Sequence, residues 1–424
     1  MPHLSIAADG SHLQRDGTFF PYIVDTAWSA FADATEAEWR YYLQRRRQQG
    51  FTSVAVSILP ILHDRTVRED AREPFALDAA GHYEFSAPDP GYFANAARFT
   101  ALAREHGITL TLVVLWCNYV EGTWGADLTP WAVMPEAQRR AYVSLVVSTF
   151  GSYEPIFAIS GDDRFDGDAA IQTYAETLAQ LAAEAPQCLR TAHSSPHARM
   201  PDALGDSPDL DFFVYQSGHD MEHLELTHEL AQRYRERRVR KPVVNLEPPY
   251  ERHGYNAGKG RFTAADVRRA SWWSVLGGAS AGIGYGAHGV WQWHREGGKF
   301  TNPGFSLQPF PWQSAVHFRG ADDISLLAHL LVRHRLYRLD ADQGLLVDGV
   351  GGVRAAASSD GALVAVYQPF ARDITVRRDF TDFTVHGWDL DRRAPIVPTI
   401  NRVETGTRFE QADVEGDLLL IIER

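Results

Sequence analysis

Eight short apolar segments recur between residues 20 and 290, and helical patterns follow most of them. This alternation limits the possible folds more than any other feature of the sequence. Strands that alternate with helices build parallel sheets, and eight such units favour a closed (β/α)8 TIM barrel over an open doubly wound sheet. No glycine-rich dinucleotide fingerprint follows the first segment, which also argues against a Rossmann sheet. The expected strands are Phe20–Val24, Phe51–Leu59, Ile108–Leu115, Pro155–Ile159, Leu189–Ala192, Phe212–Tyr215, Val243–Leu246 and Gly282–Tyr285.

Three regions lie outside this alternation. Residues 1–20 turn at Asp9-Gly10 and Asp16-Gly17, which predicts a hairpin that caps one end of the barrel. Pro60–Pro90 shows no sustained periodicity and is too long for a simple connection, so we expect a functional loop or lid there. From about residue 338 the apolar residues alternate with period two, which predicts an antiparallel β-sandwich. Its expected strands are Leu345–Val347, Val353–Ala357, Leu363–Gln368, Ile374–Arg377, Phe383–Trp388 and Leu418–Ile422.

We therefore expect two domains: a catalytic barrel with its capping hairpin at residues 1–337, and a β-sandwich at residues 338–424. The net charge of −13 argues against a nucleic-acid partner, which would need a basic surface. The N-terminus has no pattern of a secretory signal, and no apolar run is long enough to span a membrane. A cytoplasmic location without a membrane partner is the resulting expectation, and the oligomeric state is left open.

The strand ends carry the candidate site. In (β/α)8 barrels the chemistry lies at the carboxyl ends of the strands. Two acids occur there, Asp162 after the fourth strand and Glu247 after the seventh, where Pro248 and Pro249 stop the strand. Paired carboxyls, aromatic platforms and hydrogen-bonding side chains suit glycoside hydrolysis. The predicted substrate-binding residues are Asp25, Trp28, Trp116, Asn118, His193, Gln216, His219, Tyr250, Tyr285 and Trp291.

Six segments in this order resemble the apiosidase-like family of glycoside hydrolases. They are Asp25-Thr-Ala-Trp28, Ser160-Gly-Asp162, His193, Tyr215-Gln-Ser-Gly-His219, Glu247-Pro-Pro-Tyr-Glu251 and Tyr285-Gly-Ala-His-Gly-Val-Trp291. The resemblance implies a retaining glycosidase, with Asp162 as acid/base and Glu247 as nucleophile, that acts on a plant or microbial glycan or glycoside. Apiose, a branched pentose, is the namesake sugar of the family. The C-terminal region resembles the collagen-binding-type module that usually follows such barrels.

The sequence departs from the family at one motif. The family usually has Gly-Gly-Asp where this chain has Ser160-Gly161-Asp162, and a second acid, Asp163, follows. Either aspartate could be the acid, although strand alternation would send neighbours to opposite sides, and Asp162 is the preferred one. For a retaining pair we expect the carboxyls of Asp162 and Glu247 to lie about 5–5.5 Å apart.

Two other functions are conceivable for this chain. A metal-dependent hydrolase could use His193, His197 and Asp162, but the first strand ends in Asp25-Thr-Ala and lacks the paired histidines typical of that class. A non-catalytic carbohydrate-binding protein would not need both strand-end acids. The prediction is a glycosidase without a cofactor or a metal. Specificity should depend on the loop at residues 60–90 and on the aromatic rim.

Overall fold

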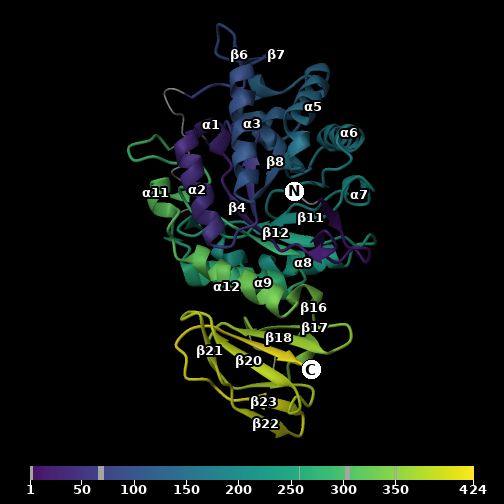
Figure 1. The fold of residues 1–424 in the computed structure, drawn as a ribbon, viewed down its shortest axis with the longest axis vertical. Helices are drawn as coiled ribbons and strands as arrows, with labels where there is room; N and C mark the ends of the chain where they lie inside the picture. The colour runs from purple at the N-terminus through teal and green to yellow at the C-terminus, as the bar shows by residue number, and fades with distance from the viewer. Residues whose placement is uncertain (1–2, 65–70, 257, 301–305, 348, 350) are drawn as a thin grey trace.

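Eight parallel strands form one sheet that curls into a barrel (Figure 1). The structure is a computed structural model and describes residues 3–64, 71–256, 258–300, 306–347, 349 and 351–424. The sheet order is β10-β9-β8-β5-β4-β15-β12-β11. The strands are β4 (Tyr22–Thr26), β5 (Ser53–Ser57), β8 (Thr109–Trp116), β9 (Ile156–Gly161), β10 (Arg190–Thr191), β11 (Phe213–Gln216), β12 (Val243–Glu247) and β15 (Gly282–Tyr285).

The barrel closes because its first strand pairs with its last. β4 lies between β5 and β15, and both pairings are parallel. At the opposite seam, between β10 and β11, the Asp211 amide donates to the Arg190 carbonyl oxygen at 2.9 Å. The Thr191 hydroxyl donates to the Phe212 carbonyl oxygen at 2.8 Å, which bridges the same seam. The predicted (β/α)8 barrel is therefore confirmed.

Helices cover the outside of the barrel (Figure 1). A capping box starts α2, since the side chains of Thr35 and Glu38 each accept from the other residue's backbone amide. The connection after β10 holds a four-residue helix, α7, which begins after Pro201 and ends at Gly205. The main helices are α2 (Glu36–Gln48), α3 (Pro90–Glu105), α5 (Glu136–Phe150), α6 (Asp168–Glu184), α7 (Asp202–Gly205), α8 (Leu226–Arg235), α9 (Ala264–Leu276) and α12 (Gly320–Arg333).

The N-terminal hairpin has a third strand and lies at the bottom of the barrel. β1 (Leu4–Ile6), β2 (Leu13–Arg15) and β3 (Thr18–Phe19) form a small antiparallel sheet. The Arg15 guanidinium donates to the hydroxyl of Thr109, the first residue of β8, at 2.7 Å. The small sheet therefore covers the amino ends of the barrel strands and leaves the opposite mouth open.

The long loop after β5 contains regular structure that the sequence did not predict. β6 (Phe75–Leu77) and β7 (Tyr83–Pro88) form an antiparallel hairpin within the segment expected to be irregular. Only one face of this hairpin is partly buried, so its apolar signal is weak. Residues 65–70 of the same loop lie outside the described residues.

Two antiparallel sheets follow the barrel, as predicted for a β-sandwich. One has the order β16-β17-β18-β24-β20-β21, and the other β19-β23-β22. The expected strand Leu345–Val347 is instead a short 3-10 turn with one bridge, Leu346 to Val376. The strands are β16 (Leu339–Ala341), β17 (Arg354–Ser358), β18 (Leu363–Gln368), β19 (Ile374–Val376), β20 (Thr384–Asp389), β21 (Ala394–Ile396), β22 (Ile400–Val403), β23 (Gly406–Phe409) and β24 (Leu418–Glu423).

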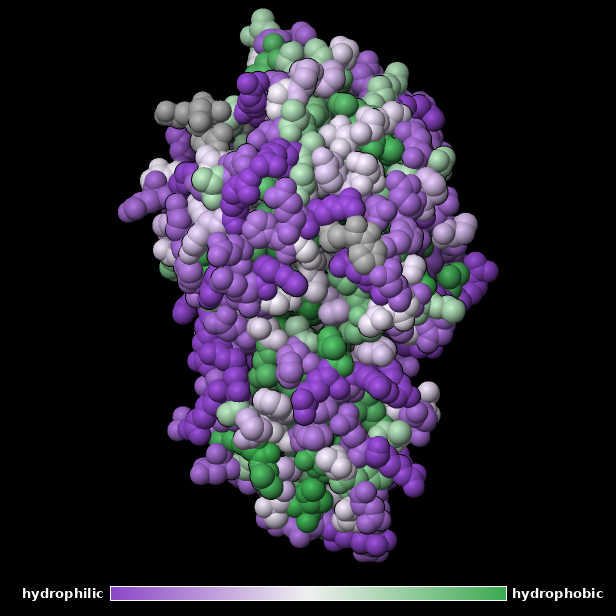
Figure 2. All heavy atoms as spheres, in the orientation of Figure 1, coloured by the Kyte–Doolittle hydropathy of each residue, from purple (hydrophilic) through white to green (hydrophobic). Residues whose placement is uncertain are grey.

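The larger C-terminal sheet is apolar on both faces. Val366 and Leu420 belong to the core between the two sheets, whereas Tyr367 and Leu419 pack into the barrel's own core. The sheet therefore packs against α9, and α12 lies beside α9 above it (Figure 1). Hydrophobic side chains also reach the visible surface over the C-terminal sheets, while the barrel half of that face is mainly hydrophilic (Figure 2). Among the described residues, none of the helices is long and apolar enough to cross a bilayer.

Candidate active site

Glu247, the last residue of β12, is buried and receives three hydrogen-bonding groups. Its Oε1 accepts from the Gln216 side-chain amide at 3.0 Å and lies 3.1 Å from His219 Nε2. Its Oε2 lies 3.3 Å from His193 Nε2. Burial alone would raise the pKa of Glu247, but the contacts with His193 and His219 outweigh it and lower the pKa to about 2. The carboxylate is therefore ionised at neutral pH.

Backbone amides fix the tautomers of both imidazoles. The amide of Asp162 donates to His193 Nδ1 at 3.1 Å, and the amide of Tyr250 donates to His219 Nδ1 at 3.3 Å. A neutral imidazole that accepts at Nδ1 carries its proton at Nε2. The Nε2–H of His219 then donates to Glu247 Oε1, while Nε2 of His193 lies 3.3 Å from Oε2.

Asp162 faces the same cavity from the residue after β9. Its φ of 53° puts the backbone in the left-handed region, which aspartate tolerates better than most residues. Burial and the neighbouring charge of Glu247 raise the pKa of Asp162 well above its usual value. The Ser195 hydroxyl lies 2.6 Å from the Asp162 carbonyl oxygen and 3.0 Å from Oδ1. Since a hydroxyl has one proton, a protonated Asp162 can donate to Ser195 while Ser195 donates to the carbonyl.

Asp163 points away from this cavity. Its carboxylate accepts from the Phe165 amide at 2.5 Å and from the Tyr174 hydroxyl at 2.9 Å. Tyr174 lies on α6, so the second acid ties the loop after β9 to the helix that follows. The two neighbouring carboxyls point in different directions because the backbone turns at Asp162, which has a left-handed conformation. The alternation of side chains along a strand, on which the preference for Asp162 was based, is not the cause.

A cavity of about 580 Å³ opens at the carboxyl ends of the strands. This volume is within the range of small-molecule sites. Cavities of about 630 and 830 Å³ elsewhere on the surface hold none of the predicted site residues. Eight of the predicted residues line the cavity at the strand ends: Trp28, Trp116, Asp162, Gln216, His219, Glu247, Tyr250 and Trp291.

Two glycines make room for the aromatic walls of the cavity. A Cβ on Gly161 would lie 2.3 Å from the Trp116 ring, so the residue before Asp162 must be small. A Cβ on Gly286 would lie 2.2 Å from the Tyr250 ring. The Tyr250 hydroxyl in turn accepts from Trp28 Nε1 at 2.9 Å. The glycines of the Ser160-Gly-Asp162 and Tyr285-Gly segments therefore serve packing.

Three predicted substrate contacts need correction, because their side chains are wholly buried and do not line the cavity. Asp25 pairs with Arg46 at 2.6 Å inside the barrel wall. Tyr285 donates to Glu251 at 2.7 Å. Asn118 accepts from His63 Nδ1 at 3.0 Å. His193 is also fully buried, and it acts on Glu247 from behind the cavity wall.

Several cavity residues were missed because they come from loops and not from strand ends. Trp124 donates to the Asp162 carbonyl oxygen at 2.7 Å and packs on the His63 ring. His253 stacks on His219 with ring centroids 4.2 Å apart. Arg164 lies 5.8 Å from the Trp124 ring centroid, beside the proposed acid. The tryptophan beside Gly122 and Gly125 was the one signal available, since aromatic residues next to glycines often line clefts.

The residues of the alternative metal-dependent mechanism do not converge. His193 faces Glu247, and the His197 ring packs against His223 with centroids 5.3 Å apart. In the described part of the chain, one group of three potential metal ligands lies within 4.8 Å of one another, and it contains neither His193 nor Asp162.

Comparison with known proteins relates this chain to glycoside hydrolases. A family model described as "Apiosidase-like, catalytic domain" matches residues 7–338. A structure titled "Glycoside hydrolase" covers 100% of this chain and 97% of its own, with 19% identity and a TM-score of 0.82. A glycoside hydrolase family 5 structure from Bacteroides vulgatus ATCC 8482 covers 99% of this chain and 93% of its own, with 19% identity and a TM-score of 0.81.

A family 5 mannosidase from Rhizomucor miehei is more distant, with 12% identity, a TM-score of 0.55, and coverage of 79% of this chain and 98% of its own. At such identities the likeness to solved structures shows a shared fold. No curated protein sequence matches the chain.

Proposed function

Because the chain belongs to the apiosidase-like family of glycoside hydrolases, we propose that it cleaves a glycosidic bond with retention, using Glu247 as nucleophile and Asp162 as acid and base. One observation carries this proposal. Two carboxyls in one cavity have pKa values shifted in opposite directions, down for Glu247 and up for Asp162. Such a division supplies one ionised and one protonated carboxyl at the same pH.

In the first step, protonated Asp162 gives its proton to the glycosidic oxygen and the aglycone leaves as an alcohol. A Glu247 oxygen forms a bond to the anomeric carbon as the glycosidic bond breaks, which leaves a glycosyl ester. The contacts with Gln216, His193 and His219 also orient Glu247 for attack. The loss of the Glu247 negative charge then lowers the pKa of Asp162, which prepares it to act as a base.

In the second step, ionised Asp162 removes a proton from water. The water oxygen bonds to the anomeric carbon, and the ester bond to Glu247 breaks. The sugar leaves with its original anomeric configuration, because two displacements each invert it. Glu247 is ionised again and Asp162 is protonated, so both groups return to their starting states.

The substrate we propose is a glycoside whose terminal sugar stacks on the tryptophans of the cavity, with a pentofuranoside such as an apioside as the first candidate. Trp116 Nε1 and Gln216 Oε1 are buried and have no partner among the described residues. Both side chains line the cavity, and we expect small movements of them to present this donor and this acceptor to sugar hydroxyls. Buried polar groups that pair only with substrate reject analogues lacking those hydroxyls.

A cytoplasmic location is also part of the proposal. Cys117 and Cys188 are both buried free thiols, which is compatible with a reducing compartment. Cell fractionation with an antibody to the chain would test it.

The mechanism is tested with pairs of aryl glycosides that share a sugar and differ in leaving-group acidity. A panel of β-apiosides, arabinofuranosides and pyranosides first identifies the sugar. Asp162→Asn should then lose about 10²–10⁴-fold in rate with poor leaving groups and far less with activated ones, which need little protonation. Glu247→Gln should abolish turnover of both.

Asp163→Asn is the matched control, since it changes the adjacent carboxyl that points away from the cavity. It should show no dependence on the leaving group. Equal losses for both leaving groups in Asp162→Asn would refute the acid role. A folded protein that binds glycans but releases no sugar from the whole panel would refute hydrolysis.

A further inference from the structure

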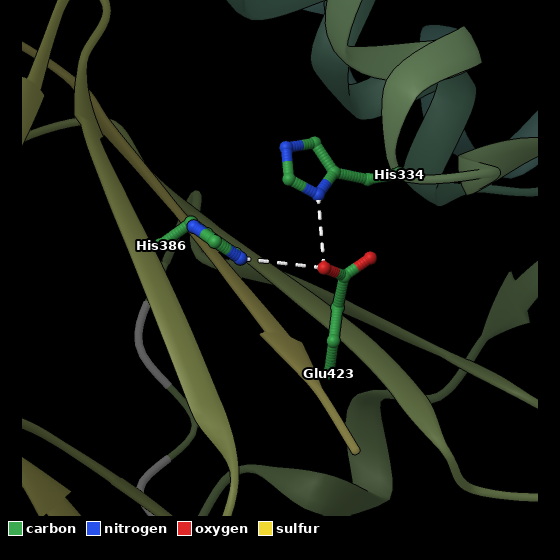
Figure 3. Close-up of side chains that lie close together, drawn as sticks. All are labelled: His334, His386 and Glu423. Atoms are coloured by element: carbon green, nitrogen blue, oxygen red, sulfur yellow. Dashed lines mark ion pairs between the residues drawn. The ribbon is translucent and has the colours of Figure 1, made fainter.

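Three side chains with metal-binding atoms converge where α12 meets the larger C-terminal sheet (Figure 3). His334 Nδ1 lies 3.1 Å from Glu423 Oε2, and His386 Nε2 lies 3.3 Å from the same oxygen. All three ligand atoms lie within 4.8 Å of one another. None of these residues lines the catalytic cavity, so the mechanism above does not explain the cluster.

The spacing of the three atoms suits a tetrahedral metal ion. Zinc bonds to imidazole nitrogen and carboxylate oxygen are about 2.0–2.2 Å long, which places neighbouring ligand atoms roughly 3.3–3.5 Å apart. The two nitrogen-to-oxygen distances, 3.1 and 3.3 Å, are close to that edge length. The third edge, between the two imidazole nitrogens, is at most 4.8 Å long and would shorten toward the same length on binding, with water as the fourth ligand.

The supporting elements also suit a cation. His334 is the C-cap of α12, and the carboxyl end of a helix carries partial negative charge. His386 lies on β20 and Glu423 on β24, which pair directly, so the sheet holds these two ligands. The His334 side chain is 3% exposed, whereas His386 and Glu423 are 35% and 33% exposed. One side of the cluster is thus protected, and the other admits an ion and its water.

We propose that His334, His386 and Glu423 bind one divalent transition-metal ion, with zinc as the best match for two imidazoles and a carboxylate. The ion joins the last barrel helix to the C-terminal sheet. Because the three ligands come from separate elements, only the folded chain presents the site, and binding therefore stabilises the folded state.

The test begins with the unaltered protein after dialysis against a chelator. Titration with zinc should show one bound ion per chain and a rise in the midpoint of thermal unfolding. Cobalt(II) in place of zinc should give the intense visible absorption of a tetrahedral site. An absence of zinc binding, with no rise in the midpoint, would show that the cluster is only a hydrogen-bonded His–Glu–His network and would overturn the proposal.

Substitutions then locate the bound ion. His386→Gln and Glu423→Gln, both at partly exposed positions, should each weaken zinc binding by at least tenfold. Even the loss of a residue that only hydrogen-bonds a metal ligand lowers metal affinity by about 10–100-fold. His329→Gln, at an exposed position on α12, is the matched control and should bind zinc as the unaltered chain does. Unchanged zinc affinity in both cluster variants would place the ion elsewhere, for example among the histidines of the catalytic cavity, and would contradict the assignment.

Discussion

His193 Nε2 faces Glu247 Oε2 at 3.3 Å, with its imidazole wholly buried. The other ring nitrogen accepts from the amide of Asp162 at 3.1 Å. One imidazole thus connects the backbone that carries the proposed acid to the carboxylate of the proposed nucleophile. It can do both only as the neutral tautomer with its proton on Nε2. A shift of either strand end would therefore move both groups.

Removal of the imidazole donors should change the acid side of the pH–rate profile. The pKa of Glu247, lowered to about 2, keeps the nucleophile ionised across the acidic range. His193→Ala or His219→Ala removes a donor, so the pKa of Glu247 should rise toward the usual value of about 4.3. We expect kcat/KM in these variants to fall as pH drops below about 5, measured between pH 3 and 7. His329→Ala serves as the control, and an unshifted acid limb in both cavity variants would contradict the assigned role of these donors.

Asp162 should reduce the stability of the fold at neutral pH. Its pKa is raised in the folded state, so its favourable contribution is complete only below the unfolded value of about 3.9 and is lost as pH rises. Asp162→Asn should therefore stabilise the protein at pH 7, because the amide does not titrate and so avoids this loss. Urea unfolding at pH 7 and near pH 3.5 measures this, and the gain should shrink at the lower pH. A variant less stable than the unaltered chain at pH 7 would rule out the raised pKa.

Arg268 on α9 joins the barrel to the C-terminal sheets through buried charge. It contacts Asp417 at 2.7 Å and Asp323 at 2.8 Å, and all three side chains are at most 5% exposed. Arg268→Met leaves the buried Asp417 carboxylate without its buried cation and Asp323 with only Arg393, which should cost about 3–5 kcal/mol of unfolding free energy. Arg392→Met, at a site 61% exposed, should change it by less than about 1 kcal/mol. Equal losses in chemical unfolding would show that the buried network contributes nothing specific.

The C-terminal sheets should be needed to keep the barrel from aggregating. We propose a catalytic domain at residues 1–337 and a supporting β-domain at 338–424, whose Tyr367, Leu419 and Ile421 pack into the barrel's core. Deletion from residue 338 would expose apolar surface on α9 and α12, so we expect aggregated protein. Light scattering and gel filtration measure the outcome. A monomeric truncation with full activity would show that the two parts are independent.

Much of the fold was predictable because the signal is local. Every residue of β8 is buried, and a strand covered on both faces reads as an unbroken apolar run. β22 has the pattern Ile-Asn-Arg-Val with two exposed residues, so it carries no such signal and was missed. The four-residue α7 and the β6–β7 hairpin were hidden for the same reason.

The sequence could predict only those site residues that stand at the carboxyl ends of strands. Glu247 could be identified because prolines stop its strand and leave the carboxylate at the tip. Asp25 and Tyr285 occupy equivalent positions, but they pair with Arg46 and Glu251, which are 21 and 34 residues away in the sequence. Only the packed structure shows which strand-end groups face the cavity and which are already paired.

The stereochemistry of the first product tests the central claim most directly. Proton NMR can follow hydrolysis of an aryl glycoside and identify the anomer released before mutarotation mixes the two forms. Attack by Glu247 followed by water assisted by Asp162 predicts a first product with the substrate's own anomeric configuration. Release of the opposite anomer would mean that water attacks directly, and Glu247 would then be a base and not a nucleophile.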